Sequence, residues 1–350
     1  WLVLLVQAFV CIDLICAARG ELCKDSGQAH VSYSSIASAA GLPGRLLVGA
    51  LFLCLAAATL VSQIAKMGEL LASFSIPYGL ACFASTALLT SFSLAGPRIV
   101  VAVNAGLTAG FAAAASLLFA AGAHAANWNR LARSDFSRCW SLAPTVLQLF
   151  VFHEILPGLC EMLDYERWRI RRAALLGSTA LLLVELSWSA LGLGLVPLSA
   201  ARQVLNGDPV NVLLEQGGSI ARIVLGLAAC AITTTVLGTN LALQSFFASR
   251  RKNSGVAPVA CFLLPAAAAT IAACSPSTFF AAIDFAGAYP VAILWGLLPP
   301  LALAFQFPSQ RPRRALLVLM ALLSASFVLC NAIADLQRWL GRSGAMARWQ

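Results

Sequence analysis

Long apolar runs with few charges follow one another along most of this 350-residue sequence. A helix needs about 20 apolar residues to cross a hydrocarbon core of roughly 30 Å, and each run is close to or above that length. The runs also lack the alternating ten-residue pattern of a membrane β-barrel. The sequence therefore predicts an all-α, multi-pass membrane helical bundle. Its ten candidate spans lie near residues 1–18, 44–72, 77–95, 98–122, 142–163, 173–196, 219–248, 256–274, 278–306 and 314–336.

Composition narrows the possible functions. Hydrophobic residues make up 60% of the chain and charged residues 11%, which is outside the range of soluble domains. The 11 cysteines lie mostly inside the apolar runs and form no CxxC pair, so we expect them to pack rather than to bind a metal or form disulfides. No P-loop, GxSxG or HExxH motif is present, and the sequence predicts neither an enzyme nor a cofactor.

Basic residues predict orientation rather than nucleic-acid binding. The formal net charge is +9, but Lys and Arg gather in short loops between spans, as topology determinants do. The tightest clusters, at residues 167–172, 250–252 and 311–314, follow alternate spans and are expected on the cytoplasmic side. The surrounding partner is a lipid bilayer, and the Ala-rich composition suits a bacterial inner membrane or a plastid envelope.

The apolar run from Leu142 to Leu163 is interrupted by two ionisable residues and a proline. Charged groups are costly in hydrocarbon, and proline removes a helical hydrogen bond, so such an interruption usually lines a cavity. A broken helix exposes main-chain groups that bind the carboxylate or ammonium of an amino acid, and we expect the open backbone near Phe152 and His153. The alternative is a kinked structural helix whose His153 and Glu154 bond to neighbouring helices. The predicted substrate-binding residues are Phe150, Val151, Phe152, His153, Glu154 and Pro157.

A second polar cluster lies inside the run from Ile220 to Ala248, where residues 233–235 are threonines and Gly238, Thr239 and Asn240 follow. These hydroxyls either bond back to their own helix or coordinate a cation or a polar group of the substrate. The candidates for cation or proton coupling are Thr234, Thr235 and Glu185, the last being a lone carboxylate within an apolar run.

Three further acidic residues also lie within or beside apolar runs. Glu69 is near a helix end, where its side chain can extend to the membrane interface. Asp284 is expected to be buried and lies close to Pro290, in a second helix that is potentially broken. Asp13 lies inside the first run.

Several short segments, in this order and spacing, resemble the bacterial and plastid tryptophan/tyrosine permeases of the amino acid–polyamine–organocation superfamily. The most specific is F-x-F-H-x-x-x-P at residues 150–157, which resembles the sixth helix of that family. The other matching segments are residues 68–73, Trp168 with Arg171 and Arg172, residues 234–238, residues 262–265 and residues 279–287.

The resemblance implies eleven helices, with two inverted repeats of five in which the first and sixth helices are broken around the substrate. By that comparison the chain holds helices two to eleven and lacks the first. Residues 1–122 are then the first repeat (helices two to five), 123–306 the second repeat (helices six to ten) and 307–350 an additional helix and tail. Val151 and Glu154 stand where the family tends to have glycine, which narrows the expected pocket.

The leading hypothesis is a secondary active transporter of amino acids, selecting aromatic ones such as tryptophan and tyrosine, by proton-coupled alternating access. Its implied partners are an amino acid substrate and a coupling cation, H+. The alternative is a non-transporting membrane scaffold or receptor, or an inactive fragment, on the same fold. A membrane-embedded enzyme is a third possibility, for which the sequence offers no clustered catalytic residues.

Overall fold

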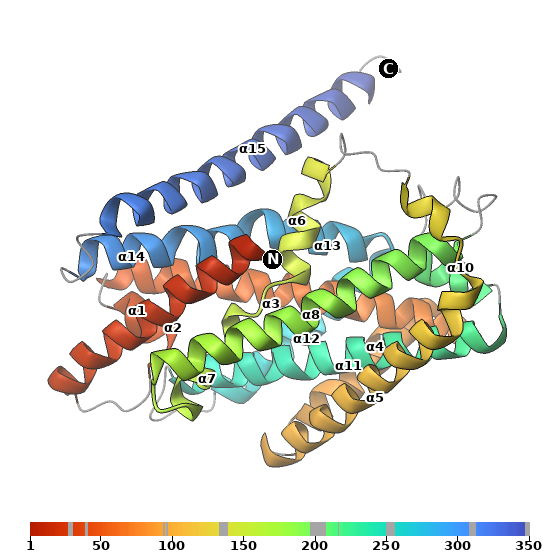
Figure 1. Cartoon of the computed structure of the whole chain (residues 1–350), viewed down its shortest axis with the longest axis horizontal. Coiled ribbons are helices and arrows are strands. Elements are labelled where there is room, and N and C mark those ends of the chain that lie inside the picture. Colours follow the sequence, from red (N-terminus) through yellow and green to blue (C-terminus); the bar gives the residue numbers. More distant parts are fainter. Residues whose placement is uncertain are drawn as a thin grey trace. The chain divides into compact units, whose positions relative to one another are not determined.

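The structure is a computed structural model that describes residues 1–26, 31–38, 41–93, 95, 97–132, 139–196, 208–215, 217–249, 256–307 and 313–346. All regular secondary structure in this described part is helical, and it contains no strand (Figure 1). Its helices are α1 (Leu2–Ser26), α2 (Tyr33–Ser38), α3 (Gly41–Ala72), α4 (Tyr78–Ser93), α5 (Pro97–Ala125), η1 (Trp128–Ala132), α6 (Cys139–Leu149), η3 (His153–Ile155), α7 (Leu156–Met162), α8 (Arg167–Leu195), α10 (Pro209–Glu215), α11 (Gly218–Ser249), α12 (Val256–Cys274), α13 (Thr278–Ala286), η4 (Gly287–Leu297), α14 (Leu298–Gln306) and α15 (Arg314–Met346).

Most of the predicted spans are confirmed as helices that can cross a membrane. Among the described residues, eight segments are long and apolar enough to do so. They are Leu2–Gly20, Gly41–Ala72, Arg98–Ala125, Cys139–Met162, Arg167–Leu195, Gly218–Gln244, Thr278–Gln306 and Arg314–Leu340. The remaining two predicted spans correspond to shorter apolar helices, Tyr78–Ser93 and Cys261–Cys274. The chain is an integral, multi-pass helical membrane protein, as its apolar runs predicted.

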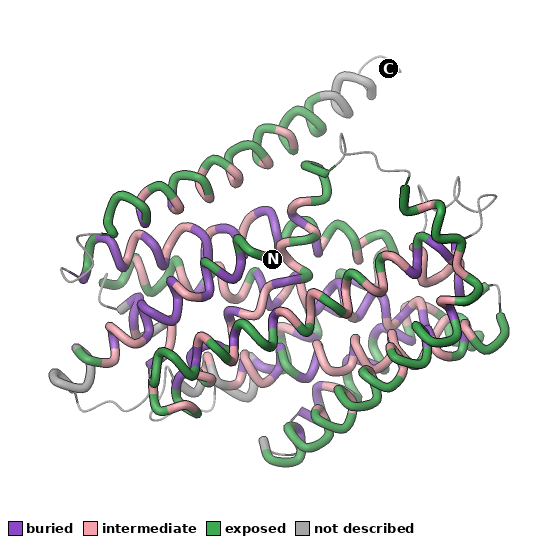
Figure 2. The backbone as a smooth tube through the Cα atoms, in the orientation of Figure 1, coloured by how far each residue is buried: buried purple, intermediate pink, exposed green. Residues whose placement is uncertain are grey.

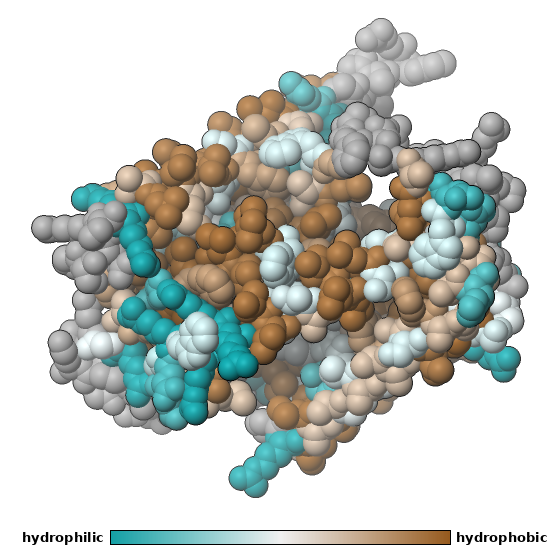
Figure 3. All heavy atoms as spheres, viewed as in Figure 1, coloured by the Kyte–Doolittle hydropathy of each residue, from teal (hydrophilic) through white to brown (hydrophobic). Residues whose placement is uncertain are grey.

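Apolar side chains on the outside of these helices agree with that conclusion. Figure 2 shows that α5 and α15 are exposed along most of their length, and their exposed residues include many leucines. In Figure 3 hydrophobic side chains cover much of the visible face, while hydrophilic ones gather where α7 ends and α8 begins. Such a surface is stable in lipid, where exposed apolar groups cost nothing.

The chain divides into two compact units that interleave along the sequence. Unit 1 comprises residues 1–55, 142–178 and 283–350, and unit 2 comprises residues 56–141 and 179–282. In unit 1, α1 packs against α7 and α14, and α15 packs against η4 and α14. In unit 2, α5 lies along α11, and α4 packs against α11 and α12. These units do not test the repeat boundaries at 122 and 306, which stay predictions.

Two membrane segments of unit 1 depart from regular α-helix. One is the break between α6 and α7, and the other is the π-helical stretch η4, which follows α13 directly and contains Pro290. π-helical turns are rare and are often found at functional sites. At Gly287, the first residue of η4, a Cβ atom would overlap the carbonyl group of Pro144 in α6. The absence of a side chain there lets the two irregular segments approach closely.

Candidate functional site

The break in the α6–α7 segment lies just before Pro157. Helix α6 ends at Leu149, residues 150–152 are not helical, and a single 3₁₀ turn leads into α7 at Leu156. Pro157 therefore occupies the first turn of α7, where a missing N–H costs no helical hydrogen bond. In the described part of the chain, the main-chain N–H groups of Val151 and Phe152 donate to no main-chain carbonyl. The break thus leaves two donors available to a ligand.

One detail of the prediction for this segment is wrong. We expected Pro157 to leave the backbone open near both Phe152 and His153. The carbonyl of His153 instead accepts hydrogen bonds from the main-chain N–H of Leu156 and from the Tyr33 hydroxyl, the latter at 2.9 Å. The reason is that the helix breaks upstream of the proline. The open groups are N–H donors at residues 151 and 152, rather than a carbonyl at 153.

His153 lies at the centre of an aromatic cluster in unit 1. Its side chain is fully buried and stacks against Phe152, at 5.2 Å between ring centroids, and against Trp295 of η4, at 5.6 Å. Trp295 also contacts the ring of Tyr33 at 4.6 Å. Neither ring nitrogen of His153, nor the indole nitrogen of Trp295, has a hydrogen-bond partner within the described residues. Buried unpaired polar atoms are costly, so they often indicate a site where a ligand or another conformation supplies the partner.

The other predicted residues of this segment lie around the cluster. Phe150 and Pro157 are buried, whereas Val151 and Glu154 are half-buried. Within the described residues Glu154 forms no ion pair, so the alternative in which it bonds to a neighbouring helix gains no support. The binding role of these residues stays a prediction. The sequence did not point to Tyr33 and Trp295, which contact His153 from distant segments of the chain. The only feature that could have indicated them is an aromatic ring with a polar atom in or near an apolar run.

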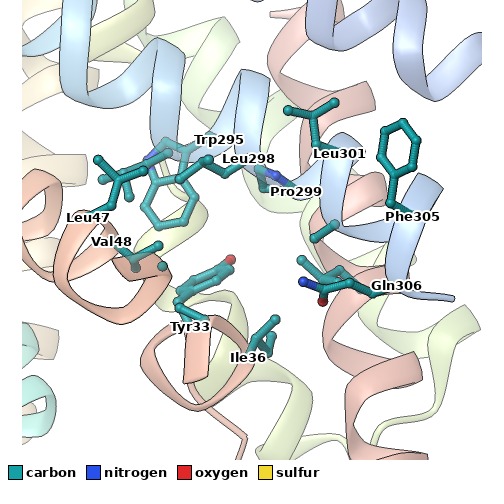
Figure 4. Close-up of a pocket in the computed structure, with 15 residues that line it drawn as sticks. Tyr33, Ile36, Leu47, Val48, Trp295, Leu298, Pro299, Leu301, Phe305 and Gln306 are labelled. Atoms are coloured by element: carbon teal, nitrogen blue, oxygen red, sulfur yellow. The ribbon is translucent and has the colours of Figure 1, made fainter. Parts of the chain in front are cut away.

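A cavity of about 290 Å³ lies beside this aromatic cluster, also within unit 1 (Figure 4). Its size is at the lower end of the range for small-ligand pockets. Tyr33 and Trp295 belong both to the cavity wall and to the cluster, but no residue of the predicted set 150–157 lines the cavity. Its wall is formed by Leu14, Tyr33, Ile36, Ala37, Gly44, Leu47, Val48, Leu294, Trp295, Leu298, Pro299, Leu301, Ala302, Phe305 and Gln306.

The predicted coupling residues belong to unit 2, so the structure does not place them relative to the broken helix. The hydroxyls of Thr234 and Thr235 both donate to the carbonyl of Ala231, at 2.9 and 2.8 Å, which is the back-bonding that the sequence left open as one reading. Their lone pairs can still accept a bond or coordinate a cation. Asn240 is 3% exposed, and its side-chain oxygen and nitrogen have no partner among the described residues. Glu185 is half-buried and has no ion-pair partner among the residues that the structure describes.

Glu69 lies near the end of α3, as predicted, and its side chain forms an ion pair there. It is held by Lys66, which is only 4% exposed and lies one helical turn earlier in α3. The Lys66 Nζ is 2.5 Å from Glu69 Oε2 and 2.5 Å from Asp208 Oδ2, and it donates to Asn211 Oδ1 at 2.8 Å. A buried ammonium needs nearby carboxylates, and Glu69 and Asp208 supply them. The four residues join α3 to the start of α10, all within unit 2.

The remaining acidic residues of the apolar runs have partners too. Asp13 accepts two hydrogen bonds from Arg171, at 2.6 and 2.8 Å, and lies 3.9 Å from Arg313. Asp284 was expected to be buried, but it lies on an exposed face of α13 and accepts a hydrogen bond from Thr145. Of the predicted basic clusters, residues 250–252 and Arg311 lie outside the described residues.

Comparison with known proteins identifies the family. Residues 1–335 match the model of the tryptophan/tyrosine permease family. The chain belongs to this permease family. It is also 27% identical, over 294 residues, to the tyrosine-specific transport system 2 of Haemophilus influenzae, an alignment that covers 78% of this chain and 71% of that relative. The resemblance seen in the sequence is therefore confirmed.

Permease membership fits the geometry of the molecule. The matched residues include the break between α6 and α7, the π-helical stretch η4 and the polar cluster of α11. A permease moves a small molecule across a membrane, and its substrate must meet protein groups at membrane depth. Irregular backbone is tolerated at that depth only where it is enclosed by protein or lines a cavity. The break at residues 150–152 is therefore the best candidate for the substrate site of this permease.

Proposed function

We propose that this chain is a secondary active transporter of aromatic amino acids, tyrosine or tryptophan, working by proton-coupled alternating access. The observation that carries the proposal is the break at residues 150–152, beside an aromatic cluster, where the N–H groups of Val151 and Phe152 donate to no main-chain carbonyl of the described residues. A substrate carboxylate can accept hydrogen bonds from these donors, and the side chains of Phe150 and Phe152 offer an aromatic ring an apolar surface. Family membership and the bacterial tyrosine transport relative support the substrate class.

We assign the coupling of transport to a proton or other cation to two carboxylates and two threonine hydroxyls. Glu185 and Glu154 are half-buried carboxylates with no ion pair in the described residues, so either can take up a proton without breaking a salt bridge. Thr234 and Thr235 present hydroxyl lone pairs for a coupling cation. The division into two compact units supports a motion in which one body rocks against the other. The substrate is carried chemically unchanged, across a bacterial inner membrane or a plastid envelope.

Uptake in vesicles tests this function directly. The full chain, reconstituted in proteoliposomes, is expected to take up labelled tyrosine or tryptophan saturably. An inward proton gradient should raise the accumulated level several-fold over the level at equal pH. Protein-free vesicles and a proton ionophore are the controls. Absence of saturable uptake of any amino acid would favour the alternative, a non-transporting scaffold or receptor. Uptake that does not change with the proton gradient would reject proton coupling but not transport.

His153→Phe tests the role of the buried imidazole. Phenylalanine keeps a ring that can stack on Trp295 but removes both unpaired nitrogens, so we expect the thermal midpoint to stay the same or rise. If the nitrogens bind substrate or water during the transport cycle, tyrosine uptake should fall at least tenfold. The matched control is Met162→Ala on α7, whose side chain is 82% exposed and should affect neither property. Full uptake by His153→Phe would reduce His153 to a packing residue.

A further inference from the structure

The cavity in unit 1 is unsuited to an amino acid backbone. Its wall is almost wholly apolar, and the described lining residues with a polar side-chain group are Tyr33, Trp295 and Gln306 (Figure 4). Among the described residues, no Asp, Glu, Lys or Arg side chain lines it. Moving an ammonium and a carboxylate from water into such surroundings without partners is very costly. The ligand that this cavity suits is a hydrocarbon chain.

The cavity opens towards the surface that faces lipid. Leu47 and Phe305, both in its wall, are 49% and 60% exposed. They lie on α3 and α14, within two segments that are long and apolar enough to cross the membrane. Leu46, next to the wall, is also largely exposed. The cavity is thus continuous with the lipid-facing surface of these helices, and an acyl chain can enter it without crossing water.

Basic side chains stand at the ends of the same helices. The Arg314 guanidinium lies 4.4 Å above the ring of Phe305, so it is next to the cavity wall. Arg45, which follows the wall residue Gly44 near the start of α3, is exposed. Helix α14 ends at Gln306 and α15 begins at Arg314, so these cations lie near the ends of membrane helices, where lipid headgroups are found. Arginines at this level attract anionic lipids.

We propose that this cavity binds an acyl chain of an anionic phospholipid, whose phosphate is held by Arg314 and Arg45. The site is separate from the substrate site proposed above. Trp295 connects the two, because its ring lines the cavity and also stacks against His153. An acyl chain in the cavity therefore contacts the aromatic cluster beside the broken helix. An effect of the lipid on transport rests on the proposed function, whereas its binding does not.

Fluorescence quenching by brominated lipids tests the binding. The full chain is reconstituted in phosphatidylcholine vesicles that contain increasing fractions of phosphatidylglycerol or phosphatidylcholine with brominated acyl chains. The chain has 8 tryptophans, and subtracting the signal of Trp295→Phe isolates Trp295. Bromine quenches tryptophan fluorescence only at short range. We expect half-maximal quenching of Trp295 at a mole fraction of brominated phosphatidylglycerol that is at least threefold lower than the mole fraction of brominated phosphatidylcholine needed for the same effect. The other tryptophans should show no such preference.

Two variants sharpen the result. The double variant Arg45→Gln, Arg314→Gln should lose the preference for the anionic lipid, while both brominated lipids should still quench Trp295. Ala302→Phe, which fills the cavity from its wall, should protect Trp295 from both. The proposal is overturned if Trp295 is not quenched, if both lipids quench it equally in the unaltered chain, or if saturating tyrosine relieves the quenching, which would assign the cavity to the amino acid. None of these readings requires transport, so failure here is distinct from failure of the proposed function.

Discussion

Lys66→Met is expected to lower the free energy of unfolding by about 3–5 kcal/mol, the usual cost of removing one partner from a buried ion pair. Methionine matches the length of the lysine stem but leaves Glu69 and Asp208 without their shared ammonium. Their side chains are 20% and 10% exposed, so water cannot replace it fully. The hydrogen bond from Lys66 to Asn211 is lost as well. We expect α10 to lose its attachment to α3, and little folded protein to survive extraction in detergent.

The measurement is the thermal midpoint of the purified protein, together with its recovery as a single species in size-exclusion chromatography. The matched control is the triple variant Lys66→Met, Glu69→Gln, Asp208→Asn, which removes all three charges. Replacing a whole buried ion cluster with neutral groups is often nearly neutral, so most of the stability should return. If the single and triple variants are equally unstable, the shape of lysine rather than its charge is what this site requires.

Gly287→Ala is the second change with a large expected effect. A Cβ atom at this position would overlap the carbonyl oxygen and carbon of Pro144. Both are main-chain atoms, so no side-chain rotation can relieve the clash, and α6 must move away from η4. Overpacking of this kind costs about 1–3 kcal/mol or more. Because both irregular segments begin or end near this contact, we also expect tyrosine uptake to fall at least tenfold.

Gly226→Ala is the matched control for this change. Gly226 lies on an exposed face of α11, where a Cβ atom would meet nothing within 4 Å. Alanine is favoured over glycine in a helix by up to about 1 kcal/mol, so this variant should be as stable as the unaltered chain, or more so. The thermal midpoint and the uptake, measured side by side, should therefore fall for Gly287→Ala. For Gly226→Ala the thermal midpoint should stay the same or rise, and the uptake should not fall. Equal effects of the two alanines would show that the contact with Pro144 is not essential.

Much of the candidate site could be predicted from the sequence because its signals are local. The polar residues and proline at 150–157 indicated a break, and the structure places one there, a few residues earlier than the proline suggested. For the Thr-rich segment of α11 the sequence left two interpretations open, hydrogen bonds within the helix or coordination of a ligand. The observed hydroxyl bonds to the carbonyl of Ala231 are of the first kind. By contrast, nothing near His153 in the sequence pointed to Trp295 or Tyr33, which come from other helices.

By itself the sequence determined the class of this protein, a multi-pass helical membrane permease. A membrane helix satisfies its own main-chain hydrogen bonds, so its existence depends only on the length and apolarity of one segment. Tertiary structure alone decided which groups are paired. Lys66 neutralises Glu69 and Asp208, Arg171 binds Asp13, and Gly287 admits the carbonyl of Pro144. Burial, charge pairing and close packing all depend on which distant segments meet, and no local pattern encodes that.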